Sequence, residues 1–354
     1  MFAATAPAKQ SVSDTISVLS SRLGSATLLE DRRAAILGLR SFAKEYPASV
    51  ASGALRGLIA SLSRDGDRED VDTVKVVLET LLMLFSPNPS SPEASDEVVL
   101  WMADEFAQRP DNVAILLELV DSQDTYPRLY GLQLLAAVHA ARPDLTEQCI
   151  LANPLGISRL ITALDDSREP IRNEAVLLLT NLTPASVEIQ QIVAFGGAFE
   201  KIIDIVGRRE GGLGYGGRSV EDCLILLANL VRLNPKNQAS FRELGLVPRL
   251  SALLGDPSSG LFVDDGKGLQ DGSKDDNGGR SGGAAAGLAP WAQAQRDRNV
   301  YALLAVVRLF LVSRATGVLQ NQISFWQSGL LKHALDLAFD PAMQLQLRVE
   351  VRGS

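Results

Sequence analysis

The chain has few side chains that could perform acid–base, nucleophilic or metal chemistry. Among its 354 residues are two histidines, His139 and His333, and two cysteines, Cys149 and Cys223. Neither histidine has a second histidine at metal-site spacing, neither cysteine lies in a CxxC pair, and no GxSxG, Walker or zincin pattern occurs. We therefore predict a non-enzymatic chain with no catalytic residue, no metal ligand and no cofactor, although distant residues could still assemble an active site.

Two short segments resemble ligand-binding loops but depart from them. DGSKDDNGG, at 271–279, resembles a calcium loop that lacks the closing bidentate glutamate. GLGYGG, at 212–217, resembles a phosphate loop, yet it follows a predicted helix where a dinucleotide site requires a strand. We interpret both segments as flexible insertions.

The histidine and cysteine contexts fit structural roles. His139 lies near the predicted C-terminus of a helix, where an imidazole can interact with the last carbonyls and the helix dipole. Both cysteines have apolar helical neighbours, which predicts buried thiols in a reducing compartment. The start MFAATAPAKQSVSD lacks a signal-peptide core, and no apolar run reaches the ~18 residues of a membrane span. These features predict a cytoplasmic chain.

The composition favours helices and excludes a general nucleic-acid surface. Hydrophobic residues make up 46% of the chain but aromatic residues only 5%, which is typical of helices packed through aliphatic side chains. The formal net charge is −8, whereas phosphate binding requires clustered lysine and arginine. We predict an all-α protein that does not bind nucleic acid.

The sequence contains two similar copies of one predicted long helix. SREPIRNEAVLLLTNLT, at 167–183, is followed by the similar segment RSVEDCLILLANLVRL, at 218–233. At an offset of 48 residues, three positions carry similar side chains. Glu174 aligns with Asp222, Leu177 with Ile225, and Asn181 with Asn229.

Shorter apolar helices recur beside these copies, each starting at a glycine. Their starts are Gly156, Gly197, Gly245 and Gly329, separated by intervals of 41, 48 and 84 residues. A period in the low forties is typical of armadillo and HEAT-type repeats. Two short helices followed by a long one, with an asparagine near its end, predict an armadillo-like right-handed helical solenoid.

We expect one partial armadillo-like head over 1–354, interrupted by three loops. These are a proline-rich loop at 86–95, a glycine-rich loop at 208–218, and a disordered insertion at 256–289 between the second and third helices of one repeat. The last tract is rich in glycine and aspartate, so it cannot form a core.

Three segments carry a specific family resemblance. SREPIRNEAVLLLTNLT, EIQQIVAFGGAFEKIIDIV and VEDCLILLANLVRLNPKNQASFRE resemble the globular head of the general vesicular transport factors, the Uso-type tethers of endoplasmic-reticulum-to-Golgi traffic. The resemblance is strongest over 153–244 and extends weakly to LLEDRRAAILGLRSFAKEY and NVAILLELV.

The resemblance implies a role as an interaction scaffold that promotes vesicle docking before fusion. It also implies peripheral association with Golgi and vesicle membranes, work with Rab GTPases, SNARE proteins and golgins, and a homodimer in the full-length protein. Family members continue into a coiled coil and an acidic tail, but QLQLRVEVRGS stops inside a repeat. We therefore expect a fragment or a truncated product.

The long helices supply a candidate partner-binding stripe, because residues three and four apart share a helix face. A 44-residue offset adds two positions from the preceding repeat. The predicted concave stripe contains Tyr130, Gln133, Glu174, Leu177, Asn181, Asp222, Ile225 and Asn229. It is mildly acidic with an apolar centre, which suits a partner segment bearing lysine or arginine.

Two alternatives remain. The asparagines could line a binding groove, or they could only satisfy neighbouring backbone groups. The chain could also be an armadillo adaptor in another cytosolic pathway. Leu177 and Ile225 occupy the places where import-type grooves have tryptophan, which weakens peptide capture of that kind.

Overall fold

The chain folds as a series of helices in two compact units. The computed structural model describes residues 11–86, 88, 92–208, 212–213, 217–255, 290–312 and 316–339. No strand occurs in these ranges, so the all-α prediction is confirmed. The two units are Met1–Leu178 and Leu179–Ser354, and their boundary falls inside one long helix, α11. The single head over 1–354 and the right-handedness of its solenoid stay predictions.

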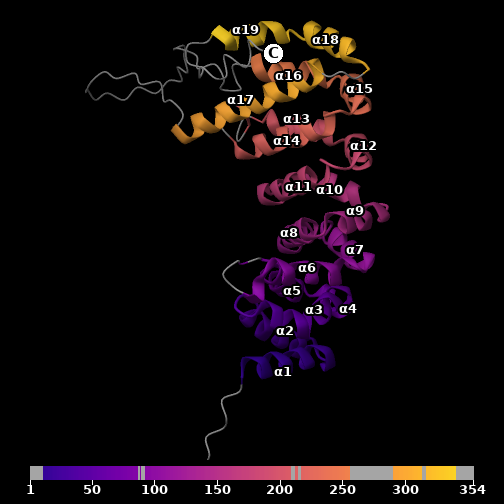
Figure 1. Cartoon of the computed structure of the whole chain (residues 1–354), viewed down its shortest axis with the longest axis vertical. Coiled ribbons are helices and arrows are strands. Elements are labelled where there is room, and N and C mark those ends of the chain that lie inside the picture. The colour runs from indigo at the N-terminus through magenta and orange to yellow at the C-terminus, as the bar shows by residue number, and fades with distance from the viewer. Residues whose placement is uncertain are drawn as a thin grey trace, which may run out of the picture. The chain divides into compact units, whose positions relative to one another are not determined.

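The first unit contains the helices up to most of α11 (Figure 1). They are α1 (Val12–Ser25), α2 (Leu29–Ala43), α3 (Pro47–Ser63), α4 (Asp65–Glu69), α5 (Val71–Leu84), the 3-10 helix η1 (Pro92–Ala94), α6 (Asp96–Ala107), α7 (Pro110–Leu119), α8 (Thr125–Ala141), α9 (Pro143–Ala152), α10 (Gly156–Ala163) and α11 (Glu169–Leu182). The 3-10 helix η1 lies within the predicted loop 86–95.

The second unit contains the last turn of α11 and the helices that follow it. They are α12 (Val187–Phe195), α13 (Ala198–Val206), α14 (Arg218–Val231), α15 (Pro235–Glu243), α16 (Leu246–Gly255), α17 (Pro290–Leu311), α18 (Val318–Gln327) and α19 (Leu330–Phe339). The triplets α12–α14 and α15–α17 have the predicted order of two short helices and one long helix. The predicted insertion 256–289 falls between α16 and α17, outside the described residues.

Polar side chains begin several helices, as the sequence indicates. The Asp70 carboxylate accepts a hydrogen bond from the Thr73 amide at 3.1 Å and caps α5. Ser186 caps α12 through the Ile189 amide at 3.2 Å, and Asn234 caps α15. Each cap satisfies an amide that has no partner within its own helix.

Two different physical constraints explain why glycine recurs before the second helices. Gly197, Gly245 and Gly329 have φ angles of 88°, 69° and 82°, the left-handed region that only glycine adopts without strain. Each forms the sharp corner before a second helix. At Gly156 the constraint is steric instead, because a Cβ there would lie 2.5 Å from the carbonyl oxygen of Ile150.

Four phenylalanines form a continuous aromatic core in the second unit. Phe199, Phe241, Phe310 and Phe325 come from α13, α15, α17 and α18, and successive ring centroids lie 5.1, 5.1 and 5.5 Å apart. All four side chains are fully buried. Offset and edge-to-face packing of this kind adds to the free energy of burial, so these rings fix how successive helices stack.

Candidate functional site

Three of the four histidine and cysteine side chains are buried, and His333 is half-buried. His139 is buried in α8, and its Nε2 atom lies 3.3 Å from the Glu147 carboxylate on α9. Cys149 and Cys223 are buried thiols, as predicted, and burial raises the pKa of the Cys149 thiol. Within the described ranges, no group of three or more His, Cys, Asp or Glu side chains could hold a metal ion. The segment 271–279, which resembles a calcium loop, lies outside those ranges.

The described helices also lack a membrane-spanning candidate. None of them combines the length and the apolar character that crossing a bilayer requires.

The first unit places its part of the predicted stripe in a hydrogen-bonded row on the long helices. The Tyr130 hydroxyl of α8 donates to the Glu79 carboxylate of α5 at 3.3 Å, and burial together with Glu79 raises the pKa of Tyr130. Arg40 of α2 pairs with the same carboxylate at 2.9 Å. The Gln133 amide donates to the Glu174 carboxylate of α11 at 2.8 Å. The polar groups of these side chains therefore already have hydrogen-bond or ion-pair partners within the first unit.

Helix α11 exposes two further stripe residues. Leu177 keeps 42% of its surface exposed. Asn181, one turn later, is exposed. Because the boundary between the two units falls after Leu178, the eight-residue stripe as one continuous surface stays a prediction.

The second unit places its stripe residues along α14. Ile225 has 42% of its surface exposed, the same fraction as its repeat equivalent Leu177. Asp222 is half-buried, and this desolvation raises the pKa of its carboxyl group although Arg218 acts in the opposite direction. The Asn229 amide donates to the Thr180 carbonyl at 3.0 Å and to the Thr183 hydroxyl at 3.4 Å.

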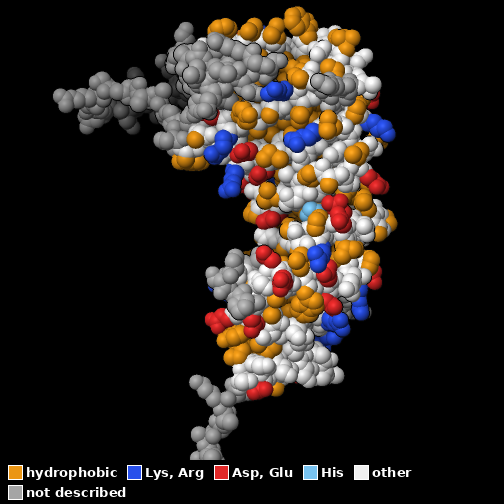
Figure 2. Space-filling view, in the orientation of Figure 1, with side chains coloured by type: hydrophobic (Ala, Val, Ile, Leu, Met, Phe, Trp, Pro, Cys, Tyr) orange, Lys and Arg blue, Asp and Glu red, His pale blue; other side chains and the backbone are white. Residues whose placement is uncertain are grey.

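A groove runs between α14 and α17, which lie side by side in Figure 1. It encloses about 660 Å³, and Ile225 lies in its wall. Figure 2 shows basic, acidic and hydrophobic side chains mixed over the region of these helices. The remaining lining residues are Glu221, Leu224 and Ala228 from α14, Arg232, which follows α14, and Ala294, Asp297, Arg298, Tyr301, Ala302 and Ala305 from α17.

Sequence reasoning missed the α17 side of this groove, in particular Tyr301, 52% exposed, and the exposed Arg298. The insertion 256–289 separates α17 from its repeat partners, so a fixed offset could not find these residues. Their spacing of three and four residues along α17 was the available signal.

Buried amides set the register of the repeats, and they were also missed. The side chains of Gln190, Gln238 and Asn321 donate to the carbonyls of Thr183, Val231 and Phe310 at 2.8, 2.9 and 3.0 Å. Each bond joins a first helix to the end of the preceding long helix and satisfies a carbonyl that the helix leaves without a partner.

This register also aligns the long helices with one another. Asn237 and Asn321 are equivalent, because they lie eight residues before Gly245 and Gly329 and donate to the carbonyls of Leu230 and Phe310. Leu230 and Phe310 therefore correspond, so the half-buried Leu309 occupies in α17 the place of Asn229, and Ala302 occupies the place of Asp222.

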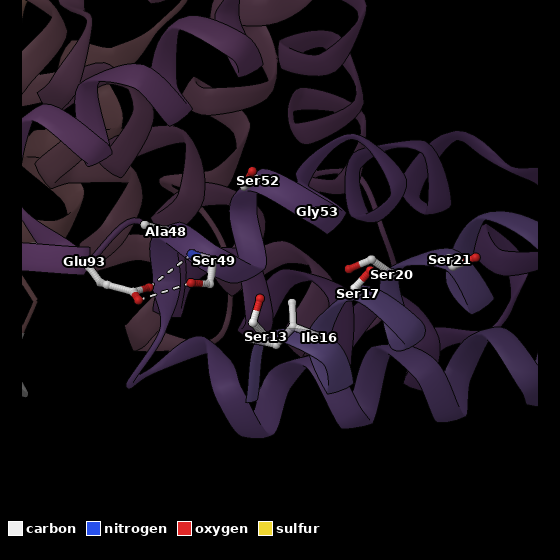
Figure 3. A pocket seen from close by; sticks show the side chains of 10 residues that line it. All are labelled: Ser13, Ile16, Ser17, Ser20, Ser21, Ala48, Ser49, Ser52, Gly53 and Glu93. Atoms are coloured by element: carbon white, nitrogen blue, oxygen red, sulfur yellow. Dashed lines mark hydrogen bonds between the residues drawn. The ribbon is translucent and has the colours of Figure 1, made fainter. Parts of the chain in front are cut away.

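A second, larger groove lies between α1, α3 and η1 in the first unit (Figure 3). It encloses about 790 Å³ and is lined by serine hydroxyls. The Glu93 carboxylate accepts hydrogen bonds from the Ser49 amide and hydroxyl, both at 3.1 Å. These hydrogen bonds hold η1 against the start of α3. We interpret Glu93 and Ser49 as residues with a structural role in helix packing.

Comparison with known proteins identifies relatives among transport factors. No family model matches the chain. It is 37% identical over 281 residues to the intracellular protein transport protein USO1 of Saccharomyces cerevisiae, covering 72% of this chain and 16% of that protein. It is 38% identical over 255 residues to the general vesicular transport factor p115 of Homo sapiens, covering 70% of this chain and 26% of that protein. The chain thus spans about a quarter or less of the length of these curated relatives.

Solved structures show the same relationship. A crystal structure of Uso1 has a TM-score of 0.81 with 31% identity, covering 99% of this chain and 51% of that chain. A designed armadillo repeat protein in complex with a peptide has a TM-score of 0.53 at 14% identity, covering 81% of this chain and 99% of that chain, which shows the fold alone. The armadillo-like fold and the predicted resemblance are both confirmed, and the chain is a homologue of the Uso1 and p115 vesicular transport factors.

Proposed function

We propose that the chain is a protein-interaction scaffold of a vesicle-tethering factor, acting in endoplasmic-reticulum-to-Golgi and intra-Golgi transport. In this role it promotes the docking of transport vesicles before fusion, without a catalytic step. The observation that carries the proposal is the 37% identity to USO1 over 281 residues. The helical repeats support it, because stacked helices present long surfaces to partner proteins.

The proposed binding surface is the exposed face of the long helices in the second unit. Ile225 and Tyr301 expose large apolar area there and line one groove. Partners of the kind proposed are Rab GTPases, SNARE proteins and golgins, with the protein peripheral on Golgi and vesicle membranes and dimeric in its full-length form. Each partner would use apolar anchors within a polar rim, as transient interfaces usually do.

A competition experiment tests this role. Purified chain is added in excess to a reconstituted assay in which vesicles from the endoplasmic reticulum dock on Golgi membranes. The chain should reduce docking by occupying partners of the resident tether. The double variant Ile225→Ser with Tyr301→Ala should compete less well, because both side chains lie in the groove.

Lys236→Ala is the matched control, since Lys236 is exposed on α15 and does not line the groove. A chain that neither binds Golgi membranes nor changes docking would contradict the proposed role. Equal competition by the groove variant and the control would place the binding surface elsewhere.

A further inference from the structure

We propose that the groove between α14 and α17 binds an acidic amphipathic helical segment of a partner protein. One large apolar side chain of that segment lies between Ile225 and Tyr301. This inference rests on the proposed interaction role and specifies the chemistry of the partner.

The middle of the groove fits an apolar anchor. Its lining combines the small side chains of Ala228, Ala302 and Ala305 with the half-exposed Ile225 and Tyr301. Small lining residues leave space for a leucine or aromatic side chain of a partner. Burying such an anchor under a tyrosine is a recurrent source of binding free energy.

The accessible charge around the groove is positive. Arg298 of α17 and Arg232, the residue that follows α14, line the groove and are exposed, whereas the exposed Arg218 and Arg308 lie outside its lining. The carboxylates on the same helices are less accessible. Glu221 is half-buried, accepts a hydrogen bond from Gln295 at 2.8 Å and lies 3.6 Å from Arg298.

The remaining carboxylates are covered as well: Asp222 is half-buried, and Asp297 is only 6% exposed. The chain as a whole carries a net charge of −8 and repels acidic proteins. Because the exposed charges of the lining are the two arginines, the groove should direct an acidic segment to one place on an acidic chain. The proposed partner differs in charge from the one that suits the predicted stripe, because Arg232 and Arg298 were not among the candidate residues.

The groove favours a helix over an extended peptide. An extended peptide in a side-chain groove needs amides that pair with its backbone, and Asn229 is the candidate on α14. Its amide nitrogen already donates to Thr180 and Thr183 within the second unit. The groove instead has an apolar centre with the guanidinium groups of Arg232 and Arg298 in its lining, which matches the anchors and carboxylates of an amphipathic helix.

Peptide binding to the whole chain tests the inference. The probe is a synthetic amphipathic helical peptide with glutamates flanking one leucine anchor, and binding is followed by fluorescence anisotropy. Its counterparts carry lysine in place of glutamate, or alanine in place of the leucine. The glutamate peptide should bind, and added salt should weaken its binding because the arginines are exposed.

Two chain variants locate the binding site. Tyr301→Ala should weaken binding of the glutamate peptide about tenfold. Reversing both Arg232 and Arg298 to glutamate should abolish it and create binding of the lysine peptide. The matched charge control is Lys236→Glu, which should leave the affinity unchanged, because this exposed lysine lies on α15 outside the groove.

Three results would overturn the inference: tighter binding of the lysine peptide by the unaltered chain, no effect of Tyr301→Ala, or glutamate-peptide binding only after deletion of residues 256–289. The last result would identify a segment of this chain as the occupant. A chain that competes in vesicle docking but binds no glutamate peptide overturns this inference alone. A chain that binds the peptide but does not affect docking overturns the proposed function alone.

Discussion

The side-chain amide of Asn229 donates a hydrogen bond to the backbone carbonyl of Thr180, and so ties α14 to the last turn of α11. Asn181, the repeat equivalent of Asn229, is exposed instead. Two asparagines that the sequence treats as copies therefore differ in environment: Asn229 makes the backbone contact that the structural alternative describes, and a partner-binding role for either residue stays a prediction.

Asn229→Ala should lower the free energy of unfolding by about 1 kcal/mol, because a hydrogen bond to a partly buried carbonyl is lost. Asn181→Ala should change it by less than about 0.5 kcal/mol, as exposed substitutions usually do. Urea denaturation of the two single variants measures both effects. Equal destabilisation by the two substitutions would contradict the distinction.

Gln238→Ala should lower the free energy of unfolding by about 2–3 kcal/mol, because the Val231 carbonyl and the Asn321 amide both lose a buried partner. Gln320→Ala is the control, since this glutamine is exposed on α18. Denaturation followed by circular dichroism compares the two. A near-neutral Gln238→Ala would show that water replaces the amide and that the register does not depend on it.

Gly245→Ala should destabilise the chain by about 1–2 kcal/mol through its backbone conformation alone. An added Cβ at this corner meets no atom within 4 Å, but φ is 69°. Gly24, inside α1, also has open space around an added Cβ and no positive φ, so Gly24→Ala should be stabilising. Opposite shifts of the denaturation midpoint would confirm the assignment, and shifts of the same sign would refute it.

Asp222→Asn should raise the melting temperature at neutral pH. Burial raises the pKa of the Asp222 carboxyl in the folded chain, so folding disfavours its charged form. The penalty is fully present above the raised folded pKa and disappears as pH falls below the unfolded value of about 3.8. The gain from asparagine should therefore shrink on acidification. A gain that stays constant between pH 7 and pH 3 would assign the effect to something other than charge.

Much of the fold could be predicted because it depends on local patterns. Apolar spacing, capping residues and the corner glycines are each set by a few neighbouring residues, and α12, α13 and α14 follow the predicted order. The Leu177 and Ile225 pair was also predicted, and both residues expose the same fraction of their surface.

The candidate site could be predicted only in part because it depends on pairings between distant residues. Whether Asn229 faces a partner or the Thr180 carbonyl is decided by how α14 packs on α11, which no spacing within one helix encodes. Arg298 and Tyr301 join the groove only once α17 lies beside α14. Neither residue was part of the predicted stripe.

The amides of Gln190 and Gln238 each reach back seven residues, across the corner from a long helix to the next repeat. The corner from α17 to α18 is longer, since Asn321 reaches back 11 residues to the Phe310 carbonyl, so such a corner should accommodate only a few added residues while a buried amide still reaches its carbonyl. The connection from a second helix to a third carries no such bond in the triplet α15–α17, within the described residues, and the 34-residue stretch 256–289 falls there. Changes of chain length in such a molecule should thus accumulate ahead of the long helices, where they vary the surroundings of the groove while its walls keep their alignment.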